Sequence, residues 1–383
     1  MSALASAPAS RRDRLGTCLR EGWDGGWLRW LHRHPTVLMT VATGVAGGGV
    51  AIVASDATWP AAARVWTRLA PGWLLVVLTG AALAIAAYVV AYRALLQVRG
   101  GPQLPTALVA QIVAVGFGPF LPAGGFAADR HALRALGDEP QAAKVTVSAI
   151  GWLELAVLSP AVAIAAAWAL LTGAPARLSA GLVPWVWGVP LGFMLAVGAW
   201  RLVCRCGLDP AASGGRVGDA AASGWRNGLG SWLAGVGVLL GLRHQPRVAL
   251  AALAGMAGYW ACDLVSFDAA LRVVGIHLDL RLAVVVYATG YALTRRSMPL
   301  GGAGITEILM AYALEWVGVA LAPAVAAVVV YRIFNFLLPA VPALLVHQNV
   351  EPLLEAEDGE HAGDPLFLSA EDAIVEEAGE ASV

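Results

Sequence analysis

Four ionisable residues lie in stretches that are otherwise apolar: Glu154, Asp263, Glu307 and Arg332. A charged side chain at the centre of a bilayer costs about 2.5–3.5 kcal/mol on insertion scales, so each needs a partner or a function. A Glu–Arg pair would neutralise both charges, either to lock two helices together or to bind an anionic headgroup. Asp263 shares a helix face with Tyr259, which favours a hydrogen-bonded structural carboxylate.

Arginines also stand beside two glycine-rich turns. A helix that begins behind such a turn offers free backbone N–H groups, and a nearby guanidinium adds bidentate recognition of phosphate. This suits the headgroup of a phospholipid or of a polyprenyl phosphate; a plain cytoplasmic helix that obeys the positive-inside rule is the alternative. The candidate substrate-binding residues are Gly124, Gly125, Asp129, Arg130, Arg134, Glu154, Arg295, Arg296, Gly301, Gly302, Glu307 and Arg332.

The two turns share the spacing Pro-x-Gly-Gly, at residues 122–125 and 299–302. Pro and Gly leave backbone N–H and C=O groups unpaired, and lipid cannot satisfy them, so such backbone must face protein or a watery cavity. Broken elements in corresponding positions of two halves point to a transport site. Ordinary turns outside the membrane are the alternative interpretation.

The rest of the sequence indicates a polytopic membrane protein. Of its 383 residues, 58% are hydrophobic and only 13% are charged, which is more apolar surface than one soluble core can hide. A membrane-spanning helix needs about 20 apolar residues. Six stretches meet this length, which predicts an all-α helical bundle: 36–55, 72–97, 144–171, 182–204, 248–272 and 319–347.

Two further apolar stretches, 108–121 and 282–293, are short and run into the glycine-rich turns. We interpret them as re-entrant or broken helices, each followed by a second half-helix, at 127–136 and 306–317. A full crossing at each position is the alternative, and it would raise the number of spans to eight or more.

The charges predict the organisation of the chain in the membrane. Arginines are concentrated in the N-terminal segment and in alternate loops, so both termini are expected on the cytoplasmic side of the inner membrane. A basic segment, 1–35, precedes a membrane domain, 36–348, and an acidic, disordered tail occupies 349–383. The membrane domain divides into halves, 36–204 and 248–348. The connection, 205–247, contains a flexible linker and a helix, 223–244, that lies either at the interface or partly buried.

The two halves are predicted to form an inverted repeat, with one turn entering from each side of the membrane. In the corresponding alignment, Glu154 falls one position from the counterpart of Arg332, so the two are expected to face each other. Asp268 and Arg272 are four residues apart near a helix end, which is typical of a snorkelling surface pair.

Other classes of function find no support in the sequence. The four cysteines are too scattered for a disulfide framework, and the basic residues do not suggest nucleic acid. No P-loop, zinc-protease or serine-hydrolase motif occurs, and we predict neither an enzyme nor a cofactor nor a metal site.

The motifs resemble those of the lysylphosphatidylglycerol synthase transmembrane-region family, to which the flippase half of multiple peptide resistance factor proteins belongs. The resemblance is carried by PLGGAGITE at 299–307, YRIFNFLLP at 331–339 and LPAGGFAAD at 121–129, and it extends over residues 72–347. It adds Tyr331 and Asn335 to the candidate site. The family commonly has arginine where this chain has Thr306 and Leu155, and these differences bear on headgroup preference.

The resemblance implies a stand-alone, flippase-like domain that moves an amphiphilic lipid between leaflets, with the lipid as its principal partner. Two alternatives stay open. One is an enzyme or accessory subunit of lipid-linked glycan or aminoacyl-lipid synthesis, partnered by a membrane glycosyltransferase or lipid-modifying enzyme. The other is a small-solute transporter that uses Asp263 or Glu154 as a proton-coupling carboxylate.

Overall fold

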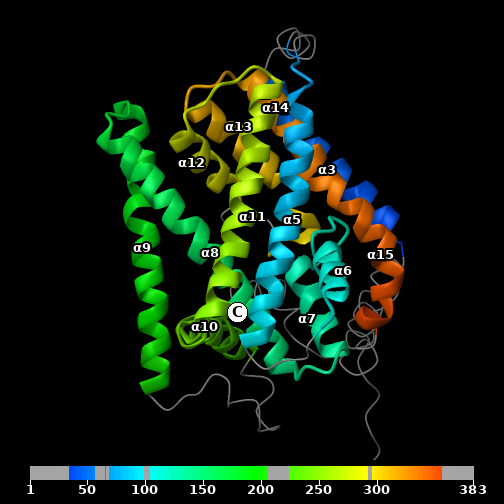
Figure 1. The fold of residues 1–383 in the computed structure, drawn as a ribbon. Helices are drawn as coiled ribbons and strands as arrows, with labels where there is room; N and C mark the ends of the chain where they lie inside the picture. The colour runs from blue at the N-terminus through cyan, green and yellow to red at the C-terminus, as the bar shows by residue number, and fades with distance from the viewer. Residues whose placement is uncertain are drawn as a thin grey trace, which may run out of the picture.

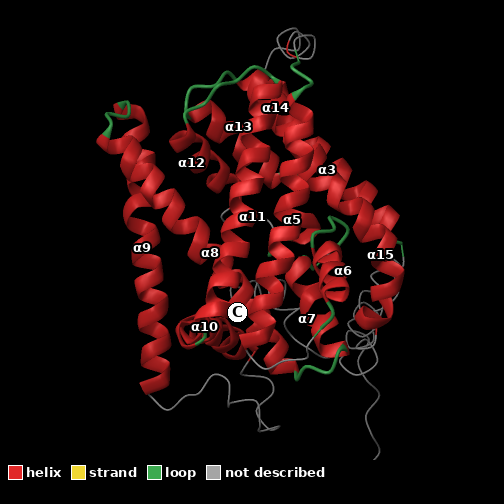
Figure 2. Ribbon diagram, in the orientation of Figure 1, coloured by secondary structure: helices red, strands yellow, loops and turns green. Residues whose placement is uncertain are grey.

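The structure of the protein is a computed structural model. It describes residues 34–56, 65, 69–98, 104–121, 123–205, 224–291 and 296–355. Throughout these ranges the chain forms helices joined by turns and loops, without a strand, which confirms the all-α prediction (Figure 2). Residues 1–33 of the predicted basic segment, most of the predicted linker, and residues 356–383 of the predicted acidic tail lie outside the described residues.

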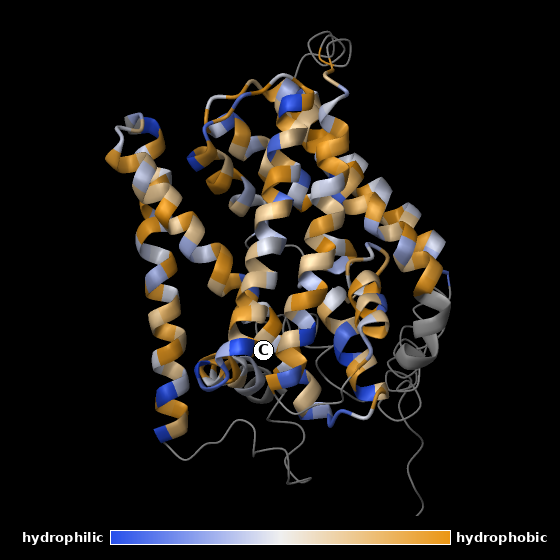
Figure 3. Cartoon of the chain, viewed as in Figure 1, coloured by the Kyte–Doolittle hydropathy of each residue, from blue (hydrophilic) through white to orange (hydrophobic). Residues whose placement is uncertain are grey.

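Six helical segments among the described residues are long and apolar enough to cross a membrane, which confirms a multi-pass membrane protein with the predicted number of spans. Hydrophobic residues run along all of them, and hydrophilic residues gather toward the ends of the bundle (Figure 3). The first five spans are α3 (Pro35–Asp56), α5 (Trp73–Val98), α8 (Pro140–Leu171), α9 (Ala176–Arg205) and α11 (Pro246–Val273).

The sixth span, predicted over 319–347, is confirmed over Leu321–Val346, with a π-helical turn inside it. It consists of α14 (Leu321–Arg332), a π-helical turn (Ile333–Leu337) and α15 (Leu338–Glu355). A π turn adds a residue to the helical turn and thereby re-aims side chains, which is why such turns occur frequently at functional sites. The helix also continues to Glu355, six residues beyond the predicted start of the tail at 349.

The two short apolar stretches form helices of 11 and 12 residues, α6 (Thr106–Gly116) and α12 (Leu280–Tyr291). At 1.5 Å per residue neither can cross a hydrocarbon core about 30 Å thick. A half-helix follows each glycine-rich turn, α7 (Gly125–Ala135) and α13 (Ile305–Trp316). The first pair lies at the lower end of the bundle and the second at the upper end (Figure 1). The two pairs of short helices therefore lie at opposite ends of the bundle, and their re-entry from each side of the membrane stays a prediction.

Contacts between the halves follow the pattern expected of an inverted repeat. The long helices α5 and α11 pack against each other at the centre, α6 packs against α15, and α12 packs against α8. Each short helix thus packs on a helix of the other half. The central pair approaches closely at glycines: a Cβ on Gly80 would lie 2.9 Å from the carbonyl oxygen of Cys262, and one on Gly255 would lie 2.6 Å from the nitrogen of Ala91.

Three of the described helices, α3, α9 and α10 (Gly224–Gly241), have no counterpart in this repeat, and α9 packs on α8 and α10. Helix α3 packs on α13 and α14, with Gly49 against the backbone of Gly304. Helix α10 packs on α8, where Gly235 meets the backbone at Ser148 and Ala149. Of the two alternatives for this helix, partial burial against the bundle is the one observed. A short 3₁₀ turn (Leu242–His244) joins it to α11.

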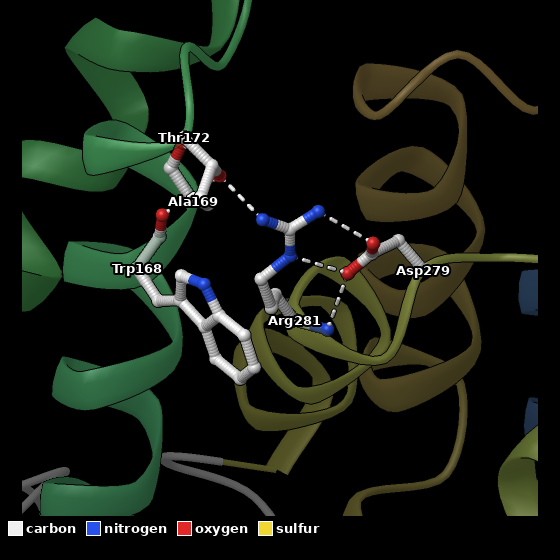
Figure 4. Close-up of polar contacts among 5 residues, drawn as sticks. All are labelled: Trp168, Ala169, Thr172, Asp279 and Arg281. Carbon is white, nitrogen blue, oxygen red and sulfur yellow. Dashed lines mark hydrogen bonds and ion pairs between the residues drawn. The ribbon is translucent and has the colours of Figure 1, made fainter.

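Arg281 at the start of α12 ties this helix to the end of α8 (Figure 4). Its guanidinium donates to both carboxylate oxygens of Asp279, at 2.7 and 2.6 Å, and to the hydroxyl of Thr172, and it lies 5.4 Å from the centre of the Trp168 ring. The hydrogen bonds from the Arg281 side chain, and then that from its backbone N–H, lower the pKa of Asp279 below its ordinary value.

We predict that Gly255→Ala destabilises the fold by about 1–3 kcal/mol, because the new methyl group would press on the backbone of α5. Gly198→Ala in α9 is the matched control. Its Cβ would meet nothing within 4 Å, and alanine is the better helix former by about 0.5–1 kcal/mol. Thermal unfolding of the purified protein in detergent checks both. Equal melting temperatures for the two variants would contradict the close contact of α5 and α11.

We also predict that the Asp279–Arg281 bridge makes stability depend on pH. The pKa of Asp279 is lowered in the folded protein, so its stabilisation is present above the ordinary aspartate pKa and is lost as the pH falls through the lowered value. Asp279→Asn should lower the melting temperature at neutral pH, and the gap to wild type should close as the pH falls below the ordinary aspartate pKa. A gap that stays constant over this range would show that the bridge does not titrate.

Candidate functional site

The two glycine-rich turns meet inside the bundle. The backbone N–H of Leu300 donates to the carbonyl of Leu121 at 3.0 Å, and the N–H of Phe126 donates to the carbonyl of Arg296 at 3.2 Å. Gly124, with φ of 80°, stands so close that a Cβ would lie 2.9 Å from the carbonyl oxygen of Arg296. Each turn therefore satisfies backbone groups of the other, and glycine is what allows the approach.

The second turn carries an unusual backbone. Leu300 is the one described non-glycine residue with positive φ, at 53°, and Gly301, Gly302 and Gly304 follow with φ of 63°, 70° and 83°. A left-handed leucine is strained, and such strain persists where the surroundings over-determine the conformation. Helix α13 then begins, and the Glu307 carboxylate accepts a hydrogen bond from the N–H of Gly304 at 2.7 Å.

Arg296, immediately before the second turn, reaches across to the first half of the chain. Its guanidinium lies 2.5 Å from the carboxylate of Asp129 on α7, and the two side chains are 1% and 0% exposed. The rings of Tyr88, Phe117 and Phe126 surround the cation, with centres 4.8, 4.6 and 5.5 Å from it. The ion pair is thus removed from water, and cation–π interactions hold Arg296 of the second half against aromatic rings of the first half.

Arg332, the last residue of α14, forms the second buried ion pair. It lies 2.5 Å from the carboxylate of Glu307, with side chains 7% and 2% exposed, and packs 4.3 Å from the centre of the Phe336 ring. Glu307 therefore both caps α13 and neutralises an arginine of the sixth span.

A small cavity lies between the two arginines. Its volume is about 20 Å³, enough for about a single water molecule and far below the several hundred Å³ of a typical ligand pocket. Several buried polar atoms at the two pairs have no hydrogen-bond partner: Nε and Nη1 of Arg296, Nη2 of Arg332 and Oδ1 of Asp129. The residues that line the cavity are Gly116, Phe117, Gly118, Gly125, Arg296, Gly301, Arg332, Asn335 and Phe336.

Beside the cavity, the carboxyl group of Asp263 on α11 is hydrogen-bonded to three side chains. These are the hydroxyls of Tyr287 and Tyr331 and the amide nitrogen of Asn335. All four side chains are buried, which confirms the prediction of a hydrogen-bonded carboxylate. No group of three or more His, Cys, Asp or Glu side chains in the described ranges could hold a metal ion.

The predicted pairing of Glu154 with Arg332 is wrong. Arg332 pairs with Glu307, whereas Glu154 accepts a hydrogen bond from the Tyr88 hydroxyl at 2.7 Å. The half-helix α13 packs directly on α14, so its carboxylate reaches Arg332. The surface pair Asp268–Arg272 is confirmed at 2.7 Å, with both side chains partly exposed.

The structure brings part of the predicted site together. Gly125, Arg296, Gly301, Arg332 and Asn335 line the cavity. Asp129 and Glu307 hold its arginines, Gly124 and Gly302 shape the turns, and Tyr331 binds Asp263. Arg130 and Arg134 are half-exposed on α7 and do not line the cavity, and Arg295 lies outside the described residues.

The sequence analysis did not predict that Gly116, Phe117 and Gly118 line the cavity, and it did not predict the tyrosines of α12 beside it. The break Gly116-Phe117-Gly118-Pro119 directly precedes the first turn and could have signalled a second point of close approach. Tyr287 and Tyr291, spaced i and i+4 on α12, share the helix face that turns toward Asp263 and Asn335.

Comparison with known proteins gives one family. The family model described as Lysylphosphatidylglycerol synthase TM region matches residues 39–343, most of the chain. Among curated proteins, none matches this sequence. The matched region contains both glycine-rich turns, both buried ion pairs and the cavity between them.

We predict strong energetic coupling between Asp129 and Arg296. Arg296→Met leaves a buried carboxylate without its cation and should cost about 3–5 kcal/mol, whereas adding Asp129→Asn should recover most of this loss. Unfolding of single and double variants in detergent gives the coupling energy through a double-mutant cycle, with Arg272→Met as a surface control. Strictly additive losses would contradict the pair.

Proposed function

The chain belongs to the lysylphosphatidylglycerol synthase transmembrane-region family, and from this premise we propose that it moves an amphiphilic lipid with an anionic, phosphate-bearing headgroup between membrane leaflets. Phospholipids and polyprenyl phosphates are the two substrate classes that fit. We place the protein in the inner membrane, with both termini cytoplasmic, because its arginines are concentrated in the loops on that side.

The observation that carries the proposal is the pair of arginines at the cavity. Arg296 and Arg332 are almost fully buried, yet each keeps N–H groups without an acceptor, and both line the same space between the two glycine-rich turns. A phosphate offers several acceptor oxygens, and guanidinium groups bind them in bidentate geometry. Glycines on both sides leave room for a ligand to approach the backbone.

In the conformation observed, Asp129 and Glu307 occupy part of the arginines' hydrogen-bonding capacity, and the cavity is too small for a headgroup. In this proposal the conformation is a closed state, and the two carboxylates take the places that phosphate oxygens would occupy. Opening requires the turns to separate, and since they come from opposite ends of the bundle, separation toward either end exposes the same arginines to that side.

Lipid translocation in proteoliposomes tests the proposal. Wild-type protein should move fluorescently labelled phosphatidylglycerol across the bilayer, while a labelled glycolipid without phosphate should move no faster than in protein-free vesicles. Arg296→Gln and Arg332→Gln should each slow the phospholipid about tenfold or more, because a hydrogen bond to a charged group contributes about 1.5–3 kcal/mol.

Arg272→Gln is the matched control, since Arg272 belongs to an exposed pair remote from the cavity lining, and it should leave the rate unchanged. Arg332→Lys retains the positive charge but loses the planar guanidinium group that can bind phosphate through two N–H groups. This variant should therefore fold and still slow translocation. Wild-type protein that moves no phosphate-bearing lipid, or cavity variants that match wild type, would refute the proposal.

A further inference from the structure

A closed ring of four side chains lies beside the cavity: Asp263, Tyr331, Tyr291 and Asn335. Their exposed fractions are 0%, 0%, 4% and 5%. They come from three elements, α11, α12 and the broken sixth span, so the ring joins the centre of the bundle to the wall of the cavity. Buried polar atoms of this kind are expected to be hydrogen-bonded.

Each member of the ring contacts the next. The amide nitrogen of Asn335 lies against Oδ1 of Asp263, and the amide oxygen of Asn335 is 2.8 Å from the hydroxyl of Tyr291. The hydroxyl of Tyr331 lies 2.8 Å from that of Tyr291 and 2.8 Å from Oδ2 of Asp263. The ring therefore has four contacts, and a hydrogen is needed in each.

The neutral members supply only three hydrogens. Each tyrosine hydroxyl has one, and the Asn335 amide places one N–H along the ring whichever way the amide is turned. An ionised carboxylate only accepts, so one contact would join two oxygens with no hydrogen between them. Further neighbours of these atoms do not change the count, because they add no hydrogen to the ring.

We propose that Asp263 carries a proton in this closed conformation. The carboxyl group then donates to Tyr331, Tyr331 donates to Tyr291, Tyr291 donates to the Asn335 oxygen, and the Asn335 N–H returns to Asp263. All four contacts are filled with one orientation of hydrogens. Tyr287, outside the ring, donates to Oδ2 of Asp263 in addition.

The proton is linked to the cavity through the broken span. Asn335 lines the cavity and lies in the π turn, and Tyr331 directly precedes Arg332. When Asp263 loses its proton to water, one ring contact has no hydrogen and the ring must open at a residue of α12 or of the sixth span. If the proposed translocation holds, uptake and release of one proton by Asp263 accompany closing and opening of the cavity.

Other ionisable groups surround α11. The buried and half-buried ones on α11 itself and on the described helices that pack against it are Tyr88, Tyr92, Lys144, Glu154, Tyr259, Cys262, Asp268, Arg272, Arg281, Tyr287 and Arg332. The hydrogen count of the ring is independent of them, because none of them adds a hydrogen to its four contacts.

Infrared difference spectroscopy of the purified protein tests the proton without any substrate. At neutral pH, wild-type protein should show the C=O stretch of a protonated carboxylic acid, which shifts in D₂O. Asp263→Asn should remove this band, because the variant has no carboxyl group at this position. The asparagine amide can still donate to Tyr331, so the fold should be preserved. Asp268→Asn, on the same helix, should keep it.

Two tyrosine variants test whether the ring, rather than burial alone, keeps the proton on Asp263. In Tyr291→Phe the hydroxyl of Tyr331 is released to donate to Asp263, so the carboxyl no longer needs its proton and the band should be lost. In Tyr287→Phe the ring is untouched and the band should remain. A wild-type spectrum without a band that Asp263→Asn removes, or equal behaviour of the two tyrosine variants, would overturn the proposal.

A separate experiment tests the coupling between the proton on Asp263 and lipid translocation. In proteoliposomes, a pH gradient should change the rate of lipid translocation by wild-type protein, and Asp263→Asn should lose this dependence while Asp268→Asn retains it. Vesicles that move lipid with no response to the gradient would overturn the coupling. Vesicles that move no lipid would refute the proposed function, whereas the infrared result would still decide whether Asp263 holds a proton.

Discussion

The structure depends on one constraint: backbone and charged groups at membrane depth must find their partners within the protein. The two glycine-rich turns meet this constraint together. Leu300 donates to Leu121 and Phe126 donates to the Arg296 carbonyl, so each turn satisfies groups that the other leaves open. A single re-entrant turn could not do this alone, which explains why the two halves of the repeat meet at their broken elements.

The charges obey the same constraint, and they decide where the molecule can move. Asp129 and Glu307 both follow a glycine-rich turn, and each neutralises an arginine on another element. The partners therefore lie on the short elements and at the break of the sixth span, whereas α5 and α11 are interlocked through glycines along their length. In the proposed translocation, opening the cavity separates the ion pairs and the turns while the central helices stay packed.

The sequence predicted this architecture where local chemistry determines it. Pro-x-Gly-Gly at two places marked the turns, and an arginine in an apolar span marked Arg332 as a group that needs a partner, whereas Arg296 was predicted only as a headgroup ligand beside the second turn. The partners could not be predicted, because pairing depends on which helix packs beside which. Glu154 was assigned to Arg332 through the repeat. In the structure α13 packs on α14, and this brings Glu307 rather than Glu154 to Arg332. The π turn left no sequence signal at all.

The ring at Asp263 shows why a carboxylate in an apolar span has more than one meaning. From the sequence, Asp263 and Tyr259 suggested a structural hydrogen bond on a single helix. In the fold, hydrogen-bonding side chains from α12 and from the sixth span meet at Asp263. Only this arrangement forms the closed ring in which hydrogens can be counted. Since Asn335 belongs both to that ring and to the cavity wall, the proposed proton on Asp263 connects the hydrogen bonds of the ring with the wall of the cavity.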